Sequence, residues 1–136
     1  MKTTLKISLA ALIAATAIIS SCGKYEEGPK ISLASKKGRV VNNWKLSEYL
    51  INGSSQNLGG VSYLMDVKKD GSYTVTTSFG NGDGKWAFSS DKTQLITTPT
   101  GSNTATTATI LRLKSNEMWT KEVDNGTTYE SHYVSN

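Results

Sequence analysis

The sequence predicts an all-β protein: an eight-stranded antiparallel up-and-down β-barrel that follows a cleaved N-terminal signal helix. Three observations predict this fold. Beyond residue 31 the chain is rich in Thr, Ser, Tyr, Trp and Val, which favour strands. Apolar residues recur there with period two, and the short runs end at turn residues such as Asp70-Gly71 and Asn125-Gly126. A sandwich is the alternative, but short connections favour a barrel, whose closure removes both exposed sheet edges.

Residues 1–21 have the layout of a secretory signal. Lys2 and Lys6 precede an apolar run over residues 7–19, and small residues follow it. The alternative is a transmembrane anchor. These 13 residues rise only about 20 Å as a helix, whereas the hydrocarbon core of a bilayer is about 30 Å thick. We therefore expect a cleaved signal peptide rather than a permanent span.

Cys22, the single cysteine of the chain, directly follows this segment. Ile19-Ser20-Ser21-Cys22 resembles the lipobox of bacterial lipoproteins, an aliphatic residue and two small residues before the cysteine. The resemblance implies that the Cys22 thiol receives diacylglycerol and that its amine is acylated, for example with palmitate, after cleavage. Three acyl chains are more than stable membrane anchoring requires. The alternative is an ordinary buried cysteine.

Residues 22–30 read as a lipidated flexible tether, with Gly23, Gly28 and Pro29 as linker residues. Lys24 followed by Glu26 and Glu27 resembles the export tag of surface lipoproteins of Bacteroidetes. This resemblance implies an outer-membrane location with exposure at the cell surface. The periplasmic face of the membrane is the alternative location.

The composition predicts one domain over residues 31–136 and excludes partners that are selected by charge. Removing residues 1–21 leaves 115 residues, enough for one compact domain. The formal net charge falls from +4 to about +2, because Lys2 and Lys6 leave with the signal. A nearly neutral chain lacks the basic footprint of a nucleic-acid-binding protein, so we expect no nucleic acid as a partner.

The period-two pattern defines the elements in order. Residues 31–43 are expected to form a short helical or irregular plug, because Gly38 weakens any longer helix. The loops Asn52–Gly60 and Thr98–Thr104 and a turn at Asn81–Gly84 interrupt the strands. Strand 117–123 is apolar on both faces, so its orientation stays open. The eight expected strands cover residues 44–51, 61–68, 72–79, 85–89, 93–98, 107–114, 117–123 and 127–134.

Over residues 31–136 the chain resembles a lipocalin-like domain of Bacteroidetes lipoproteins. The resemblance rests on "SKKGRVVNNWKL", "GKWAFSSDKTQL", "ILRLKSNEMW" and "TTYESHYV". It implies that Trp44 packs across the closed end of the barrel, and Arg112 is a candidate for the arginine that lipocalins stack on this tryptophan. Asn42 stands where lipocalins carry a glycine. The resemblance therefore supports the barrel better than any particular ligand.

Strict alternation predicts which side chains point into the barrel. Aromatic side chains with polar atoms can bury a hydrophobic ligand and still hydrogen-bond its head group. Core packing is the alternative role for each of them. Glu48 is expected to point inward, where an unpaired carboxylate costs several kcal/mol, so it pairs with Arg112 or a tyrosine, or lies at the barrel mouth. The ligand-binding candidates are Trp44, Glu48, Tyr63, Tyr73, Phe79, Trp86, Phe88, Arg112, Tyr129 and Tyr133.

The sequence gives no support for catalysis, a metal or a cofactor. His132 is the single histidine, and alternation places it on the face opposite Tyr129 and Tyr133, as an exposed residue. The Asn81–Gly84 segment is read as a polar turn rather than as a calcium or phosphate loop, because no Lys-Ser/Thr and no helix follow it. We therefore expect a protein that is not an enzyme and needs no cofactor.

Two function classes follow. The leading hypothesis is a lipid-anchored outer-membrane protein that binds or carries a small hydrophobic molecule in its barrel. Such a carrier is expected to hold an interior cavity of a few hundred Å³. The alternative is a non-enzymatic interaction module with a solid core: an inhibitor, adhesin or subunit of a cell-surface complex that works through its rim loops.

Overall fold

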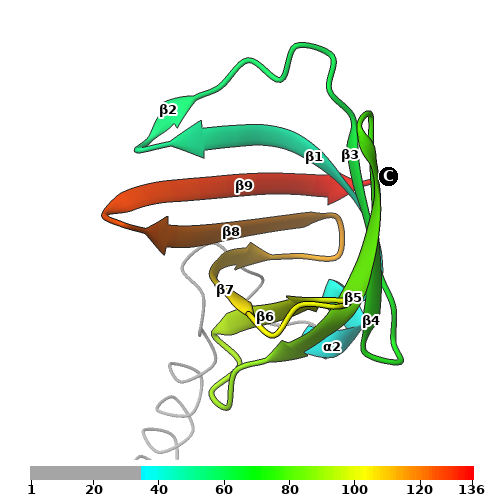
Figure 1. Ribbon diagram of the computed structural model, residues 1–136. Coiled ribbons are helices and arrows are strands. Elements are labelled where there is room, and N and C mark those ends of the chain that lie inside the picture. Colours follow the sequence, from blue (N-terminus) through cyan, green and yellow to red (C-terminus); the bar gives the residue numbers. More distant parts are fainter. Residues whose placement is uncertain (1–34) are drawn as a thin grey trace, which may run out of the picture.

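Nine antiparallel strands and one short helix make up residues 35–136, the part of the chain that the computed structural model describes (Figure 1). Residues 1–34 lie outside the described part, and with them the expected signal segment, Cys22 and the tether. The elements are α2 (Lys36–Val40), β1 (Asn42–Ile51), β2 (Ser54–Ser55), β3 (Tyr63–Val67), β4 (Ser72–Thr77), β5 (Gly80–Phe88), β6 (Gln94–Pro99), β7 (Thr106–Leu113), β8 (Glu117–Asp124) and β9 (Thr127–Ser135).

The strands close into a barrel. Each strand from β3 to β8 pairs with the next one in sequence, β3 also pairs with β1, and β9 returns to pair with β1. Figure 1 shows β9 lying between β1 and β8. The two-residue strand β2 is an appendage that pairs with Leu50 and Ile51 of β1. The predicted eight-stranded up-and-down barrel is therefore confirmed, with β2 as an unexpected ninth strand inside the Asn52–Gly60 loop.

Two predicted hairpin turns are confirmed. Asn125 and Gly126 have φ angles of 48° and 79° and connect β8 to β9, because Asp124 pairs directly with Thr127. Gly71, with φ of 91°, ends the β3–β4 turn, where Asp70 accepts hydrogen bonds from the backbone and hydroxyl of Ser72. Both turns set the register of the strands that they connect.

The predicted turn at Asn81–Gly84 is wrong, since these residues belong to β5. The chain reverses two residues earlier, at Ser78 and Phe79. There the Thr77 hydroxyl accepts from the Phe79 N–H and donates to the Gly80 carbonyl. Gly80 has φ of 149°, which a residue with a side chain rarely adopts. Phe79 therefore lies at a hairpin tip with 86% of its surface exposed, and its predicted place inside the barrel is also wrong.

One end of the barrel is closed by packing. Trp44 is completely buried, and its indole N–H donates to the Val40 carbonyl at the end of α2, 2.8 Å away. Lys36, at the start of α2, donates to the carbonyl of Lys92 in the β5–β6 turn. Val40, Leu113 and Met118 complete the fully buried core at this end. The short helix expected within residues 31–43 is found here as α2, although Asn42 and Asn43 belong to β1, and the expected burial of Trp44 is also found.

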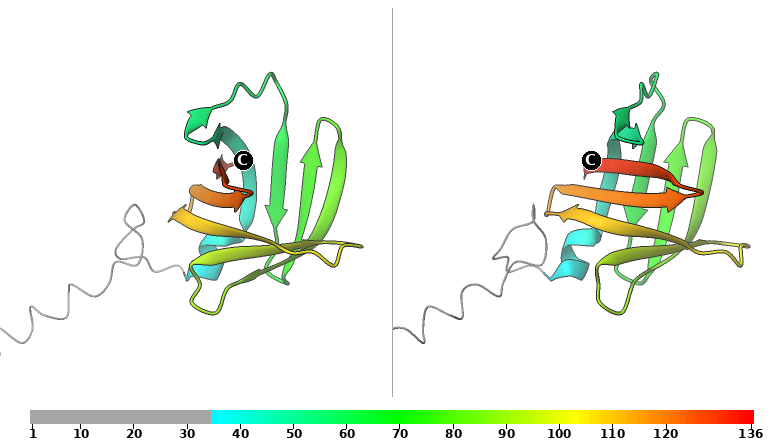
Figure 2. Two further views of the ribbon diagram at one scale, coloured as in Figure 1. Left: turned by 60° about the vertical axis from the view of Figure 1, so that its left-hand side comes forward. Right: turned by 90° about the vertical axis from the view of Figure 1, so that its left-hand side faces the viewer.

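The opposite end carries the connections β1–β3, β4–β5, β6–β7 and β8–β9. Figure 2 shows the long segment between β1 and β3, including β2, standing away from the barrel wall. Val61, Phe79 and Val123 are exposed apolar residues of these connections or of the strand ends beside them. We call this end the open end. Within residues 35–136, no helix is long and apolar enough to cross a membrane.

Two β-bulges change which side chains face the interior. In β1, Leu46 pairs with Tyr133 but Glu48 pairs with the adjacent His132, so Ser47 is the extra residue. In β7, Ile110 pairs with Thr120 but Arg112 pairs with Trp119, so Leu111 is the extra residue. A bulge shifts the alternation by one residue. Ala108 and Ile110 are consequently buried before the bulge and Leu113 after it, whereas Leu111 is half-exposed.

Candidate functional site

A cavity of about 140 Å³ lies inside the barrel, between the packed end and the open end. One part of its lining is apolar: Met65, Val75, Leu95, Ala108 and Met118. The other part offers hydroxyl and carboxylate groups: Tyr63, Tyr73, Thr97, Thr120, Glu122 and Tyr133. The lining therefore combines an apolar wall with several hydrogen-bonding groups, the pattern that small-molecule sites usually have.

The phenol groups of the cavity are held neutral. Burial is the main cause that raises the pKa of Tyr133 far above its usual value, and the nearby Tyr63 and Glu122 raise it further. Burial also raises the pKa of Tyr63, with smaller contributions from Tyr73 and Glu122. A neutral phenol both donates and accepts a hydrogen bond. These side chains can therefore bind either kind of polar group on a ligand.

Glu122 is the charged residue of the lining, and strand register explains why it points inward. The Asn125–Gly126 turn pairs Glu122 with Tyr129, and Met118 and Thr120 precede it at two-residue spacing on the same face. Glu122 remains solvent-exposed at the mouth of the cavity. Even so, neighbouring protein atoms displace part of its water, and this desolvation raises the pKa of its carboxyl group.

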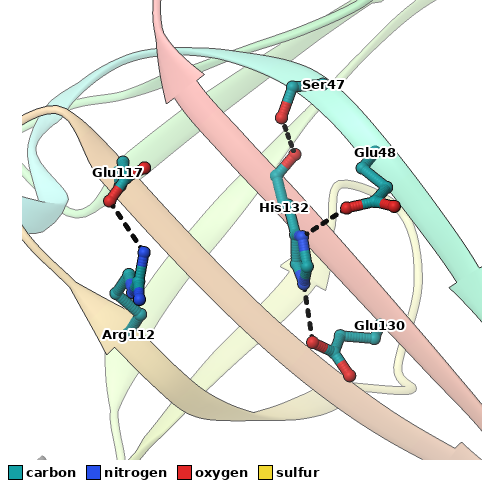
Figure 3. A network of polar contacts seen from close by, with 6 residues as sticks. All are labelled: Ser47, Glu48, Arg112, Glu117, Glu130 and His132. Carbon is teal, nitrogen blue, oxygen red and sulfur yellow. Dashed lines mark hydrogen bonds and ion pairs between the residues drawn. The ribbon is translucent and has the colours of Figure 1, made fainter. Parts of the chain in front are cut away.

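The predicted inward position of Glu48 is wrong, because the bulge after Leu46 turns its side chain to the outer wall. There Glu48 Oε2 lies 2.9 Å from His132 Nδ1, and Glu130 Oε1 lies 2.6 Å from His132 Nε2 (Figure 3). Ser47, at the bulge, donates to the His132 carbonyl. Tyr49 takes the inward position instead and stacks on Tyr129, with ring centroids 6.3 Å apart.

His132 is buried, with 9% of its surface exposed, so the expectation of an exposed residue is wrong although its predicted face is right. Its ring stacks on Trp119 at a centroid distance of 4.0 Å. Ionised carboxylates only accept hydrogen bonds, so both carboxylate contacts are hydrogen bonds when both ring nitrogens carry a proton. The imidazole, the indole and two carboxylates thus tie β1, β8 and β9 together on the outside of the barrel.

Arg112 does not stack on Trp44, and it does not pair with Glu48. Its guanidinium lies over the Trp119 ring, 3.7 Å from the centroid, and donates to Glu117 at 3.0 Å. The β7 bulge places Arg112 opposite Trp119. Arg112, Trp119, His132 and Glu48 therefore form one cross-strand row along the outer wall, which we call the outer row.

The structure separates the ten ligand-binding candidates into four groups. Tyr63, Tyr73 and Tyr133 line the cavity together. Trp44, Trp86 and Phe88 belong to the core or pack against it, with Trp86 and Phe88 in edge contact. Tyr129 lies on the inward face of β9, beside Tyr49 near the open end. The three that lie outside the interior are Glu48, Arg112 and Phe79.

Sequence reasoning missed Glu122 and Thr120 as cavity residues, although a signal for both was present. A two-residue turn at Asn125-Gly126 fixes the β8–β9 register. With Tyr129 assigned to the interior, that register places Glu122 opposite it and Thr120 one step further along the same face. The hairpin pairing thus settles the orientation of strand 117–123 that apolar periodicity left open.

Other features of the described residues offer less to a ligand. Two depressions of about 500 and 570 Å³ lie along β4–β5 and over β5–β6, and both open broadly to solvent. Within residues 35–136, no group of three or more His, Cys, Asp or Glu side chains is placed to hold a metal ion. The interior cavity is therefore the candidate functional site.

Fold and cavity together define a class: a closed up-and-down β-barrel with a small interior cavity that opens at one end. No protein-family model, no curated protein and no solved structure gives a significant match to the chain.

Proposed function

We propose that this chain is a lipid-anchored, lipocalin-like protein of the outer membrane that binds or carries a small, largely apolar molecule inside its barrel. The observation that supports this proposal most is the cavity of about 140 Å³ with its tyrosine and methionine lining. It is smaller than the few hundred Å³ expected for a carrier of larger ligands. The proposed ligand is correspondingly small.

The shape and chemistry of the cavity support binding without covalent chemistry. Met65, Val75 and Met118 offer apolar contact area, and the Tyr63, Tyr73 and Tyr133 hydroxyls offer hydrogen bonds. Burying the apolar part of a ligand contributes roughly 25 cal/mol per Å². A ligand that leaves those hydroxyls unpaired loses part of this gain.

A cavity-filling variant tests binding. Native mass spectrometry of the full chain, incubated with an envelope extract, should detect a retained small molecule. Ala108→Leu places three more carbon atoms in the cavity and should abolish retention. Ala87→Leu is the matched control, because Ala87 is exposed on the outer wall of β5. Binding in the barrel would be refuted if the unmodified chain retains no small molecule, or if both variants retain it equally.

The proposed lipid anchor rests on the sequence alone: Ile19-Ser20-Ser21-Cys22 and the apolar residues that precede this segment. Cells grown with labelled palmitate should incorporate the label into the unmodified chain but not into Cys22→Ser. The variant should also leave the membrane fraction. Proteinase treatment of intact cells distinguishes surface exposure, which the proposal expects, from the periplasmic face. If the unmodified chain incorporates no labelled palmitate, the lipoprotein proposal is refuted.

A second function is favoured by one observation at the open end. Phe79 exposes 86% of its surface, and Val61 beside the adjoining loop exposes 41%. The Ser62 N–H donates to the Ser78 hydroxyl and joins these two connections. Exposed apolar residues on linked loops suit a protein-interaction module. Crosslinking and pull-down from envelope fractions should then recover a defined protein partner, and Phe79→Ser should lose it; equal recovery would exclude this role for Phe79.

A further inference from the structure

If a ligand binds inside the barrel as proposed, the charge of the cavity lining indicates which chemical class of ligand it favours. Among the described residues that line the cavity, Glu122 is the one with a formal charge, and none is Lys, Arg or His. The other polar groups are tyrosine and threonine hydroxyls, which are neutral. A carboxylate ligand would face the Glu122 charge with no cation to offset it. A cationic ligand would instead find an opposite charge.

Glu122 is positioned to meet a ligand at the cavity mouth. It belongs to the inward row of β8 that Met118 and Thr120 begin, and it is the member of that row nearest to the open end. It stays exposed, so a ligand can reach it without displacing the barrel wall. Desolvation by its surroundings raises the pKa of Glu122, because the charged carboxylate loses part of its hydration. A bound cation would stabilise the charged carboxylate and offset this loss.

The size of the cavity limits the apolar part of the ligand. Its volume of about 140 Å³ compares with roughly 150 Å³ for an apolar protein cavity that binds benzene. The wall formed by Met65, Leu95 and Met118 therefore fits one six-membered ring or a short branched alkyl group. A long acyl chain does not fit this volume.

We propose that the cavity selects small primary amines: a ring-sized apolar body is buried against Met65 and Met118, and the ammonium group donates hydrogen bonds to Glu122 and to a tyrosine or threonine hydroxyl. This inference rests on the proposed function, because it assigns the ligand class of that same cavity. An ammonium group has three donors and no acceptor, which suits a carboxylate flanked by hydroxyl oxygens. Charge-assisted hydrogen bonds of this kind are stronger than neutral ones.

Three probes of nearly equal size test this selectivity: benzylamine, benzyl alcohol and benzoate. Each is titrated into the full chain by calorimetry or by NMR. Benzylamine should bind about tenfold or more tightly than benzyl alcohol, and benzoate should bind most weakly. In Glu122→Gln the preference for benzylamine over benzyl alcohol should disappear. Glu117→Gln is the matched control, because Glu117 lies on the same strand outside the barrel and pairs with Arg112; it should keep the preference.

The possible results separate this inference from the proposed function. Equal binding of the three probes, or an amine preference that survives in Glu122→Gln, would overturn amine selectivity while leaving binding in the barrel intact. Failure of every probe, together with no molecule retained from the envelope extract, would overturn both. Should Glu122→Gln not fold, Glu122→Asp keeps the charge one methylene shorter. It should retain the order of the probes with a smaller benzylamine advantage, and an unchanged advantage would count against Glu122 as the partner.

Discussion

The two ends of the barrel differ in what fills them. At the closed end Trp44, Leu113, Met118 and Val40 exclude solvent completely, and α2 covers them. Toward the open end the interior holds a cavity, a carboxylate and several tyrosines, while Phe79 projects into solvent. Stability therefore comes mainly from one half of the barrel, and the other half is free to carry a binding site.

Removing one large aromatic side chain at each end tests most directly whether the closed end supplies most of the stability. Trp44→Ala should lower the free energy of unfolding by about 3–5 kcal/mol, because it leaves a large cavity in a fully packed region. Phe79→Ala should change it by no more than about 0.5 kcal/mol, since an exposed side chain has little packing to lose. Urea denaturation followed by circular dichroism measures both. Comparable losses would show that the closed end is not the main source of stability.

Two glycines of β5 test where the packed region ends. At Gly84 a Cβ would overlap the Thr98 carbonyl oxygen and lie 2.8 Å from the Tyr73 ring, whereas at Gly82 nothing lies within 4 Å. Gly84→Ala should therefore cost about 1–3 kcal/mol through overpacking. Gly82→Ala, the matched control nearer to the open end, should be close to neutral. The two variants are compared by their denaturation midpoints, and equal shifts would contradict the assigned packing.

The outer row lies beside the β1 bulge, between the two ends of the barrel. His132→Phe keeps a ring against Trp119 but leaves the Glu48 and Glu130 carboxylates without their imidazole partner. We expect a loss of about 1.5–3 kcal/mol in the free energy of unfolding, the range for hydrogen bonds to charged groups. Thermal and urea denaturation measure it. An unchanged stability would mean that stacking on Trp119 accounts for the whole contribution of His132.

Glu122 gives the smallest expected effect and a pH dependence of defined sign. Its folded-state pKa is raised by desolvation, so between the unfolded and folded values the folded chain binds more protons. Its contribution to stability therefore falls as pH rises through that interval. Glu122→Gln should melt at a slightly higher temperature than the unmodified chain at pH 7, and this difference should vanish at acid pH. A lower melting temperature at pH 7 would show that the charged carboxylate stabilises the open end.

The strands and most turns were predictable because they depend on local rules. Period-two alternation located the strands, and glycine at positive φ fixed the turns at Asp70-Gly71 and Asn125-Gly126. The prediction of a turn at Asn81–Gly84 is wrong because glycine also occurs within strands, where a neighbouring group lies too close for a side chain. Gly84 lies in a strand, where the Tyr73 ring leaves no room for a side chain. Composition alone does not separate these two uses of glycine.

The candidate site was less predictable because one bulge reverses every assignment after it. Counting from Trp44 places Glu48 in the interior, whereas the extra residue Ser47 turns Glu48 outward, beside His132. In β7 the extra residue Leu111 likewise breaks the alternation, so Ile110 and Leu113 are both buried although they are three residues apart. A bulge depends on pairing with a distant strand, so it leaves no signature in the strand's own periodicity. The tyrosines of strands without bulges, such as Tyr63 and Tyr73, were placed correctly.

The position of α2 determines how an anchored barrel would be oriented. Ser35 caps α2 at the closed end, so the preceding chain joins the barrel there, on the side away from the cavity mouth. If Cys22 carries the acyl chains, the sealed base of the barrel is the part joined to the anchor, and the cavity mouth lies at the opposite end. A ligand would then enter the cavity from the untethered end of the barrel.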